Sequence, residues 1–312
     1  MADEKQAVAV QNGDSPKGFA FALTAYLLWG FLPFFMKAVA HIPAFEVVAH
    51  RIVWSVPLAG AILIWLGRTG DVKAALRSSR MLKMATLTAV LITLNWGIYV
   101  WAIGAGRALE TALGYYINPL FSIFLGAVLL KEKLNPAQMV AIGLAATAVV
   151  VLAFDAGGLP WVSIGLALTW GLYAFFRKTL PVGPNQGFFL EVLLLSVPAL
   201  GYIVYLEATG QGHFGDTGWG DVMWLMACGV VTAIPLMIYA NGAKLLRLST
   251  IGIMQYIAPT MIFIIAVFVF HEPFGTPKLI AFILIWAALA VYSTSMIMES
   301  RARRSEMPKP AE

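Results

Sequence analysis

Charge and cysteine are both scarce in this sequence. Charged residues make up 12% of the 312 residues, whereas soluble domains carry roughly 25%. Apolar residues reach 60%, and the mean hydropathy is +0.80. This composition excludes an ordinary soluble protein and predicts a polytopic membrane protein. The one cysteine, Cys228, excludes an internal disulfide, and its apolar neighbours favour a small core residue.

Catalytic and metal-binding signatures are also missing. The chain has no G-x-x-x-x-G-K-[ST] phosphate loop, which disfavours ATP-driven transport, and no H-E-x-x-H motif or Cys/His cluster with metal spacing. We therefore expect no enzyme activity, no cofactor and no metal. The net charge of +5 is small and falls on one side of the predicted membrane, which indicates contact with anionic lipid and not nucleic-acid binding.

Long apolar runs dominate the chain. Ten segments of about 20 residues are long enough to cross a bilayer as helices, so we expect an all-α protein with ten transmembrane helices. The predicted spans are Gly18–Ala40, Ala44–Leu66, Met84–Gly104, Leu109–Leu130, Pro136–Phe154, Leu159–Phe176, Gly187–Leu206, Asp221–Gly242, Leu248–Phe270 and Thr276–Met298. Seventeen of the 21 Lys and Arg residues fall on the N-terminal side of these spans and three on the other, while Arg51 lies inside a span. The positive-inside rule then predicts that both termini are cytoplasmic.

The second half of the chain repeats the first. Ile98–Val151 and Ile238–Val291 align without a gap and agree at 11 of 54 positions. The matched pairs include Tyr99/Tyr239, Arg107/Arg247, Tyr116/Tyr256, Pro119/Pro259 and Glu132/Glu272. Because each half holds five spans, an odd number, the second copy must cross the membrane in the opposite direction. Inverted repeats of this kind are typical of secondary transporters, which bind their solute near the midplane.

Several segments resemble a known family. They are AYLLWG at 25–30, AHRIVWS at 49–55, LNWGIYVWA at 94–102, GYYINP at 114–119, LSTIGIMQYIAPT at 248–260 and HEPF at 271–274. Over nearly all of Lys17–Met298 the chain is similar to the RarD branch of the EamA-type transporters, in the drug/metabolite transporter (DMT) superfamily. The resemblance implies ten helices in two EamA repeats and no ATP hydrolysis. It does not imply a substrate, although RarD proteins are named for chloramphenicol sensitivity.

These observations predict one membrane domain of two halves. We expect a cytoplasmic tail at 1–17, a first EamA repeat at 18–154, a second at 159–298 and a basic cytoplasmic tail at 299–312. The protein would lie in a bacterial inner membrane, with the lipid bilayer and a small-molecule substrate as its partners. A monomer would suffice, because both halves are in one chain, and a homodimer is the alternative.

Polar side chains inside the spans are the candidates for function, because a charge at membrane depth costs at least ~2.5–3.5 kcal/mol. The predicted residues of the substrate-binding site or translocation path are Glu46, His50, Arg51, Asn95, Tyr99, Tyr115, Tyr116, Asn118, Tyr239, Asn241, Gln255 and Tyr256. Pro119 and Pro259 are predicted helix kinks, which free backbone carbonyls four residues earlier. Tyr and Trp side chains there would suit an amphipathic or aromatic substrate.

Glu46, His50 and Glu191 are the candidate gate or proton sites. Glu46 and His50 share one helix face, and Glu191 lies in the seventh span, which corresponds to the second span of the first repeat. The alternative for both glutamates is that they snorkel to the membrane interface. Three aromatic residues could equally belong to an interfacial belt; they are Trp29, Trp170 and Tyr173.

The function that these patterns favour is secondary transport. The solutes would be small and organic, such as amino acids, metabolites or chloramphenicol-like drugs, moved by export or exchange through alternating access. The alternative is an intramembrane enzyme or membrane sensor that uses Glu46, His50 and Arg51. The enzyme is disfavoured because those residues have no duplicated partners, and the sensor because it would not require polar groups in the middle of both halves.

Overall fold

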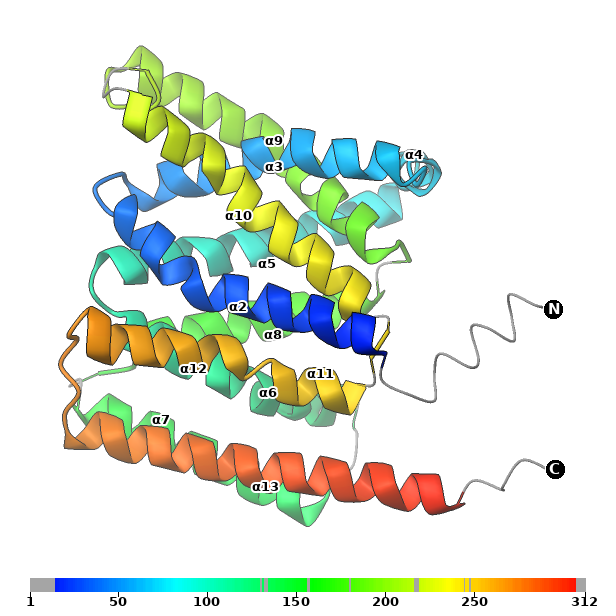
Figure 1. The fold of residues 1–312 in the computed structure, drawn as a ribbon, viewed down its shortest axis with the longest axis vertical. Coiled ribbons are helices and arrows are strands. Elements are labelled where there is room, and N and C mark those ends of the chain that lie inside the picture. Colours follow the sequence, from blue (N-terminus) through cyan, green and yellow to red (C-terminus); the bar gives the residue numbers. More distant parts are fainter. Residues whose placement is uncertain are drawn as a thin grey trace.

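The computed structural model describes residues 15–129, 131, 134–155, 158–179, 181–215, 219–243, 245–246 and 248–306. Throughout these residues every regular element is a helix (Figure 1). The helices are α2 (Pro16–Ala38), α3 (Ala44–Trp65), α4 (Gly70–Leu76), α5 (Ser79–Gly104), α6 (Ala108–Leu129), α7 (Pro136–Asp155), α8 (Trp161–Thr179), α9 (Pro184–Ala208), α10 (Trp219–Ala243), α11 (Leu248–Met254), α12 (Ile257–Ile264), the π-helix η1 (Ile265–Val269) and α13 (Thr276–Glu306). The predicted all-α class is confirmed.

Each predicted span coincides with helix in the structure, although not always with one unbroken helix. Within the described residues, seven helices are long and apolar enough to cross a membrane, namely α2, α3, α5, α7, α9, α10 and the Thr276–Met298 part of α13, and Ile257–Val269 is a shorter apolar helix. The count of ten spanning helices therefore stays a prediction. The sequence did not predict α4, because its residues form part of a polar, charged segment between two spans.

Local chemistry sets several helix ends. Gly67, Gly106 and Gly210 have positive φ angles of 65°, 70° and 66°, and each follows the last turn of α3, α5 or α9, where glycine adopts the left-handed conformation at little cost. At the start of α7, Asn135 Oδ1 accepts the Gln138 N–H at 2.7 Å while Gln138 Oε1 accepts the Asn135 N–H at 2.9 Å. This reciprocal pair is a capping box.

The predicted ninth span is broken, whereas its counterpart in the first half is not. α11 ends at Met254, a turn follows at Gln255 and Tyr256, and α12 begins at Ile257, two residues before Pro259. The Tyr256 N–H bonds the carbonyl of Ile253 only three residues earlier, 3.2 Å away. In contrast, α6 continues as one helix through Pro119. The two prolines thus occupy equivalent positions in differently shaped helices.

The chain ends differ from the predicted tails. α2 begins at Pro16, inside the tail predicted at 1–17, and residues 1–14 lie outside the described residues. α13 continues to Glu306, past the predicted end of the last span at Met298. α2 begins and α13 ends at the same end of the bundle, on the right in Figure 1. This end is termed the terminal end, and the other the opposite end.

The helices of the two halves pack in matching pairs. Across the halves, α3 packs on α9, α6 on α12 and α7 on α13. α2 packs on α10 and α12 of the second half, and its counterpart α8 packs on α5 and α6 of the first half. Exchanging the halves therefore reproduces the set of contacts. α2 runs away from the terminal end and α8 runs towards it, as the inverted repeat requires.

Glycines permit two of these close approaches at equivalent positions. A Cβ atom at Gly30 of α2 would collide with the side chain of Met261 in α12, and one at Gly171 of α8 would collide with Phe121 in α6. Both glycines follow a tryptophan in the repeated Trp-Gly pair. Because lipid is as apolar as the protein interior, close van der Waals packing of this kind holds membrane helices together.

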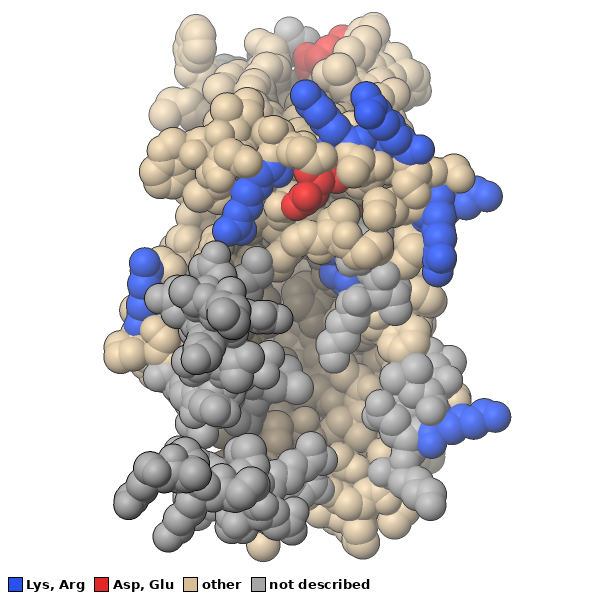
Figure 2. All heavy atoms as spheres, turned by 90° about the vertical axis from the view of Figure 1, so that its right-hand side faces the viewer, with Lys and Arg blue, Asp and Glu red and all other residues tan. Residues whose placement is uncertain are grey.

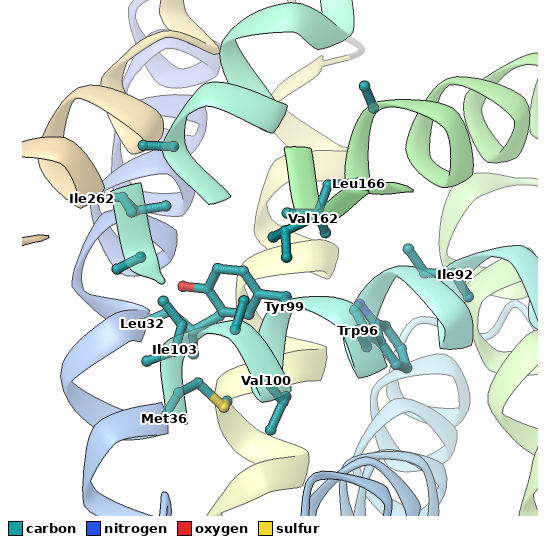
Figure 3. Packing of buried hydrophobic residues seen from close by; sticks show 14 of the residues in the cluster. Leu32, Met36, Ile92, Trp96, Tyr99, Val100, Ile103, Val162, Leu166 and Ile262 are labelled. Carbon is teal, nitrogen blue, oxygen red and sulfur yellow. The ribbon is translucent and has the colours of Figure 1, made fainter. Parts of the chain in front are cut away.

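A cluster of fully buried apolar side chains joins the halves. Figure 3 shows Tyr99 among Leu32, Ile103, Leu166 and Ile262, which come from different helices. The Tyr99 side chain is 3% exposed. The cluster forms the floor and walls of the site described next.

Candidate functional site: a cavity between the two halves

A cavity of about 980 Å³ lies between the halves and reaches the terminal end. Near that end it is lined by Gln138 at the start of α7, Arg177 near the end of α8 and Asn185 at the start of α9. Its deeper lining includes Arg51 of α3 and Trp96 of α5. Figure 2 views the terminal end and shows a hollow in the middle of the face, with Lys and Arg side chains around it.

Two clusters of aromatic rings, termed walls, line the cavity, and the internal repeat relates one cluster to the other. In one wall, the Tyr239 ring lies 5.3 Å from Trp29 and 5.6 Å from Tyr26, between centroids. In the other, Tyr115 lies 5.9 Å from Tyr99 and 6.4 Å from Trp170. The repeat relates Tyr99 to Tyr239 and Trp29 to Trp170. Trp29, Trp170 and Tyr173 all line the cavity, as the translocation path would require, and the interfacial belt remains the alternative for them.

Asn95 organises the polar part of the first wall. Its Nδ2 donates to the Leu166 carbonyl at 3.1 Å and to Thr169 Oγ1 at 3.0 Å, both on α8, and its Oδ1 accepts the Tyr115 hydroxyl at 3.3 Å. This network uses both N–H donors of the amide and one acceptor position of its oxygen to tie α5, α6 and α8 together.

Two nearby polar atoms have no hydrogen-bond partner among the described residues. They are the hydroxyl of Tyr99 and Oδ1 of Asn118, both buried atoms of side chains that line the cavity. Buried polar groups are normally satisfied, and an exception suggests a ligand or an ordered water. These two unpaired groups are therefore candidates to bond a solute.

Arg51 brings a positive charge to the cavity. Its side chain is 3% exposed, its Nε donates to Thr232 Oγ1 at 3.0 Å, and its guanidinium carbon lies 4.9 Å from the centroid of the Trp96 ring. Cation–π contact of this kind stabilises a desolvated guanidinium. Thr232 on α10 and Trp96 on α5 thus hold Arg51 between the two halves.

An ion pair flanks the cavity towards the terminal end. Arg177 Nε lies 3.3 Å from Glu191 Oε1, and the Tyr173 hydroxyl donates to Glu191 Oε2 at 3.2 Å. The Glu191 side chain is 1% exposed, so it does not snorkel. Glu191 has no arginine near it in the sequence, and the fold supplies one from α8.

A second carboxylate holds a loop over the opposite end. Glu46 accepts the backbone N–H of His213 at 2.7 Å through Oε1, and its Oε2 lies 2.8 Å from His213 Nδ1. Phe214 stacks on His50 at 5.0 Å between centroids and lies 5.8 Å from Trp54. The loop at 209–215 therefore closes this end, and Glu46, 1% exposed, is buried beneath it.

Glu272 adds a contact between halves at the same end. Its two carboxylate oxygens accept the N–H groups of Ala108 at 2.6 Å and Leu109 at 2.9 Å, at the start of α6. Burial raises the pKa of the Glu272 carboxyl, and these two N–H donors, Lys278 and Lys37 oppose that shift. A carboxylate at a helix N-terminus satisfies free N–H groups and complements the helix dipole.

The structure brings some of the predicted site residues together and not others. Those that line the cavity are Arg51, Asn95, Tyr99, Tyr115, Asn118, Tyr239 and Gln255, together with Pro119 and Pro259. Glu46, His50, Tyr116, Asn241 and Tyr256 do not line it. Their places in the translocation path stay predictions.

The residues outside the cavity have other contacts. Tyr116 bonds Thr260 Oγ1 at 2.6 Å, and its ring stacks on Tyr256 at 6.3 Å where α6 meets α12. Asn241 donates to the Met237 carbonyl of its own helix at 2.8 Å. Glu46 and His50 lie under the loop at 209–215, as described above.

Sequence reasoning missed three cavity residues of chemical interest. Trp96 and Thr232 look like ordinary members of apolar spans, and Arg177 was counted only as a loop charge that fixes orientation. Arg177 had one usable signal, because it lies four residues, about one helical turn, after the aromatic Tyr173. Thr232 carried none.

A multi-pass bundle with a solute-sized cavity between two halves is the architecture of a membrane transporter. The model of the EamA-like transporter family matches the chain twice, over residues 16–154 and 158–294. The chain therefore belongs to the EamA-like transporter family, in the RarD branch of the drug/metabolite transporter superfamily.

Relatives cover almost the whole chain. An "uncharacterized transporter YojE" of Bacillus subtilis (strain 168) is 38% identical over 302 residues, which is 95% of this chain and 100% of the relative. A "Protein RarD" of Streptomyces exfoliatus is 38% identical over 94% of this chain and 93% of the relative. A "chloramphenicol-sensitive protein RarD" of Pseudomonas aeruginosa is 29% identical over 93% of this chain and 98% of the relative. These bacterial relatives and the apolar helices support a multi-pass protein of the inner membrane.

One solved crystal structure shares the fold. It matches with a TM-score of 0.57 at 21% sequence identity and covers 93% of this chain and 99% of its own. At that identity the match concerns the fold alone.

Proposed function

We propose that the chain is a secondary transporter of small organic solutes, an exporter or exchanger that works by alternating access. The observation that carries this proposal is the cavity between inverted halves, which reaches the terminal end while the loop at 209–215 covers the opposite end. Alternating access requires a site that faces one side at a time, and inverted halves provide two related conformations for it. Its volume of about 980 Å³ suits a small molecule.

The distribution of Lys and Arg predicts which side of the membrane the open end of the cavity faces. With both termini in the cytoplasm, as the positive-inside rule predicts, the terminal end is the cytoplasmic end. The structure then corresponds to the inward-open conformation, and Glu46 and His213 belong to the closed outer gate.

The alternative of an intramembrane enzyme loses support from the geometry. Arg51 lines the cavity, whereas Glu46 bonds His213 and His50 accepts the Trp54 indole N–H at 3.2 Å outside it. An acid or base must lie within hydrogen-bond reach of the substrate. The three residues named for the enzyme alternative do not converge on one site.

Flux measurements in proteoliposomes test the transport function. A pooled panel of labelled amino acids, simple organic acids, nucleosides and chloramphenicol-like compounds is offered with and without an imposed pH gradient. We expect saturable flux of one class that is lost in Tyr99→Ala and Asn118→Ala, which change the cavity, and kept in Thr147→Ala, which removes an exposed hydroxyl outside the cavity that donates to its own helix. No flux of any class with folded protein would refute the proposal.

Proton coupling is a separate part of the proposal. It rests on Glu46 and Glu191, two buried carboxylates that pair with His213 and Arg177 near opposite ends of the bundle. Protonation of either carboxylate removes the charge that holds its partner. We expect Glu46→Gln and Glu191→Gln to abolish the dependence of flux on the pH gradient, and unchanged dependence in both variants would exclude these residues as the proton sites.

A further inference from the structure

Arg51 carries a charge that lies deep in the bundle. It is the eighth residue of α3, which places it about 10 Å along the helix at a rise of 1.5 Å per residue, and it is 3% exposed. Arginine stays protonated in proteins. Burying an unpaired charge costs several kcal/mol, so a guanidinium at this depth requires an anion or a set of acceptors.

The protein supplies only part of what Arg51 requires. Thr232 Oγ1 accepts from Nε and Trp96 covers one face. Nη1 is buried without a hydrogen-bond partner, and Arg51 forms no ion pair with any Asp or Glu in the described part of the chain. The Nη1 end of the guanidinium therefore has no partner among the described residues, in a side chain that lines the cavity.

Two other partly buried arginines, in contrast, each form an ion pair with a glutamate. Arg107 pairs with Glu110 of its own helix and also stacks on Trp101 and Trp161. Arg177 pairs with Glu191. Of these three arginines, Arg51 is the one with an aromatic face and no carboxylate, which indicates that its anion comes from outside the chain.

The geometry of the guanidinium N–H groups determines which anion fits Arg51. Two parallel N–H groups of a guanidinium match the two oxygens of a carboxylate. Tyr99, whose hydroxyl has no partner among the described residues, lines the same cavity. It can donate a further hydrogen bond to the same anion.

The rest of the lining argues against a positive group on the solute. Among the described residues that line the cavity there are two arginines, Arg51 and Arg177, and no Asp or Glu. Glu191, the buried carboxylate that flanks the cavity, is already bound by Arg177 and Tyr173. An ammonium group would find no counter-ion, whereas an aromatic or aliphatic body would contact the ring walls.

We infer that the solute of the proposed transporter is an organic carboxylate without an ammonium group, with its carboxylate on Arg51 and its apolar body between the walls of Tyr99, Tyr115 and Trp170. This inference rests on the proposed function and specifies its substrate class. It separates simple organic acids from amino acids, since the two differ by the ammonium group.

Four probes of nearly equal size test the charge requirement in the unaltered, purified full-length protein. They are 3-phenylpropionate, its amide 3-phenylpropanamide, the zwitterion phenylalanine, and 2-phenylethylphosphonate. Binding is followed by quenching of tryptophan fluorescence, because Trp29, Trp96 and Trp170 line the cavity. We expect 3-phenylpropionate to bind about tenfold or more tightly than the amide or phenylalanine, since a charged hydrogen bond contributes about 1.5–3 kcal/mol. Equal affinity for acid and amide, or no binding of the acid, overturns the inference, and tighter binding of the phosphonate overturns the carboxylate assignment.

Variants then assign the charge requirement to Arg51. Arg51→Gln should remove the preference for the acid over the amide, and Arg51→Lys should keep part of it. Arg107→Gln is the matched control, because it removes an arginine that stacks on tryptophan outside the cavity, and it should leave the preference unchanged. If Arg51→Gln does not fold, the comparison of acid and amide in the unaltered protein still decides. Flux of the amide or of phenylalanine that is independent of Arg51 would overturn this inference and leave transport standing, whereas absence of flux for every solute would refute the proposed function.

Discussion

His213 Nδ1 lies 2.8 Å from a carboxylate oxygen of Glu46, although 167 residues separate them in the sequence. The contact joins α3 of the first half to the loop between α9 and α10 of the second. The same carboxylate also accepts the backbone N–H of His213. Glu46 therefore fixes the backbone of a loop that would have to move to open the opposite end.

Glu46→Ala should loosen this end of the bundle. The loop would lose two hydrogen bonds to a charged group, each contributing about 1.5–3 kcal/mol. Cys228 is the single cysteine and is fully buried, on a helix segment that packs on α3 next to Trp54. We expect a membrane-impermeant maleimide, added from the opposite end, to label Cys228 several-fold faster in Glu46→Ala.

Glu110→Gln is the control for this experiment. It breaks an ion pair with Arg107 near the same end without touching the loop. Equal labelling rates in Glu46→Ala and the unaltered protein would show that Glu46 does not hold the opposite end closed.

Tyr99→Phe and Tyr116→Phe should separate solute binding from stability. The Tyr99 hydroxyl has no partner in the protein, whereas the Tyr116 hydroxyl bonds Thr260 at 2.6 Å. We expect Tyr99→Phe to weaken solute binding by about fivefold and leave the melting temperature unchanged. Tyr116→Phe should lower the stability by about 1 kcal/mol and leave the affinity unchanged. The reverse pattern would place the solute at the α6–α12 contact instead of in the cavity.

Gly229→Ala should destabilise the bundle strongly. A Cβ atom at Gly229 of α10 would collide with backbone atoms of Trp54 in α3, and backbone cannot rotate away. Overpacking of this kind typically costs about 1–3 kcal/mol.

Gly143→Ala provides the matched control, because a Cβ atom there meets no other group within 4 Å. It should be neutral or slightly stabilising, since alanine favours the helix. Thermal unfolding in detergent measures both variants, and similar melting temperatures would show that α3 and α10 do not need this close contact.

Glu272→Ala should weaken the contact between halves at the opposite end. It removes both acceptors of the first N–H groups of α6, and loss of a helix cap costs about 0.5–2 kcal/mol. Lys278→Met, which removes an exposed side chain bonded to the Pro273 carbonyl, should change stability by less than about 0.5 kcal/mol. Equal unfolding temperatures for the two variants would contradict the capping role of Glu272.

Most of the fold could be predicted because each helix is encoded by one continuous stretch of sequence. Apolar runs of about 20 residues define helices without knowledge of the tertiary structure, and the 140-residue offset of the repeat related the halves. The break at Gln255 and Tyr256 could not be predicted, because Pro119 stands at the equivalent position of an unbroken helix. Proline at a given position permits a break and does not impose one.

The candidate site was predicted less completely, because burial in a bundle depends on partners far along the chain. Asn95, Tyr99 and Tyr115 were found as polar side chains inside predicted spans, and the repeat also matched Tyr99 to Tyr239. Glu46 was correctly predicted to lie at an end of its span, but only the fold shows that its partner is His213. The partner of Glu191 is Arg177, which the sequence analysis had counted only as a loop charge that fixes the orientation in the membrane.

The unequal shapes of α6 and the α11–α12 segment have a consequence for the energetics of transport. Under the proposed alternating access, exchange of the two halves would move the break from Gln255 and Tyr256 to Tyr115 and Tyr116, while the ninth span becomes continuous. Each conformation then contains one interrupted helix and one intact helix. Since the number of disrupted backbone hydrogen bonds stays the same, the two conformations can remain nearly isoenergetic, and modest binding energy from a solute suffices to interconvert them.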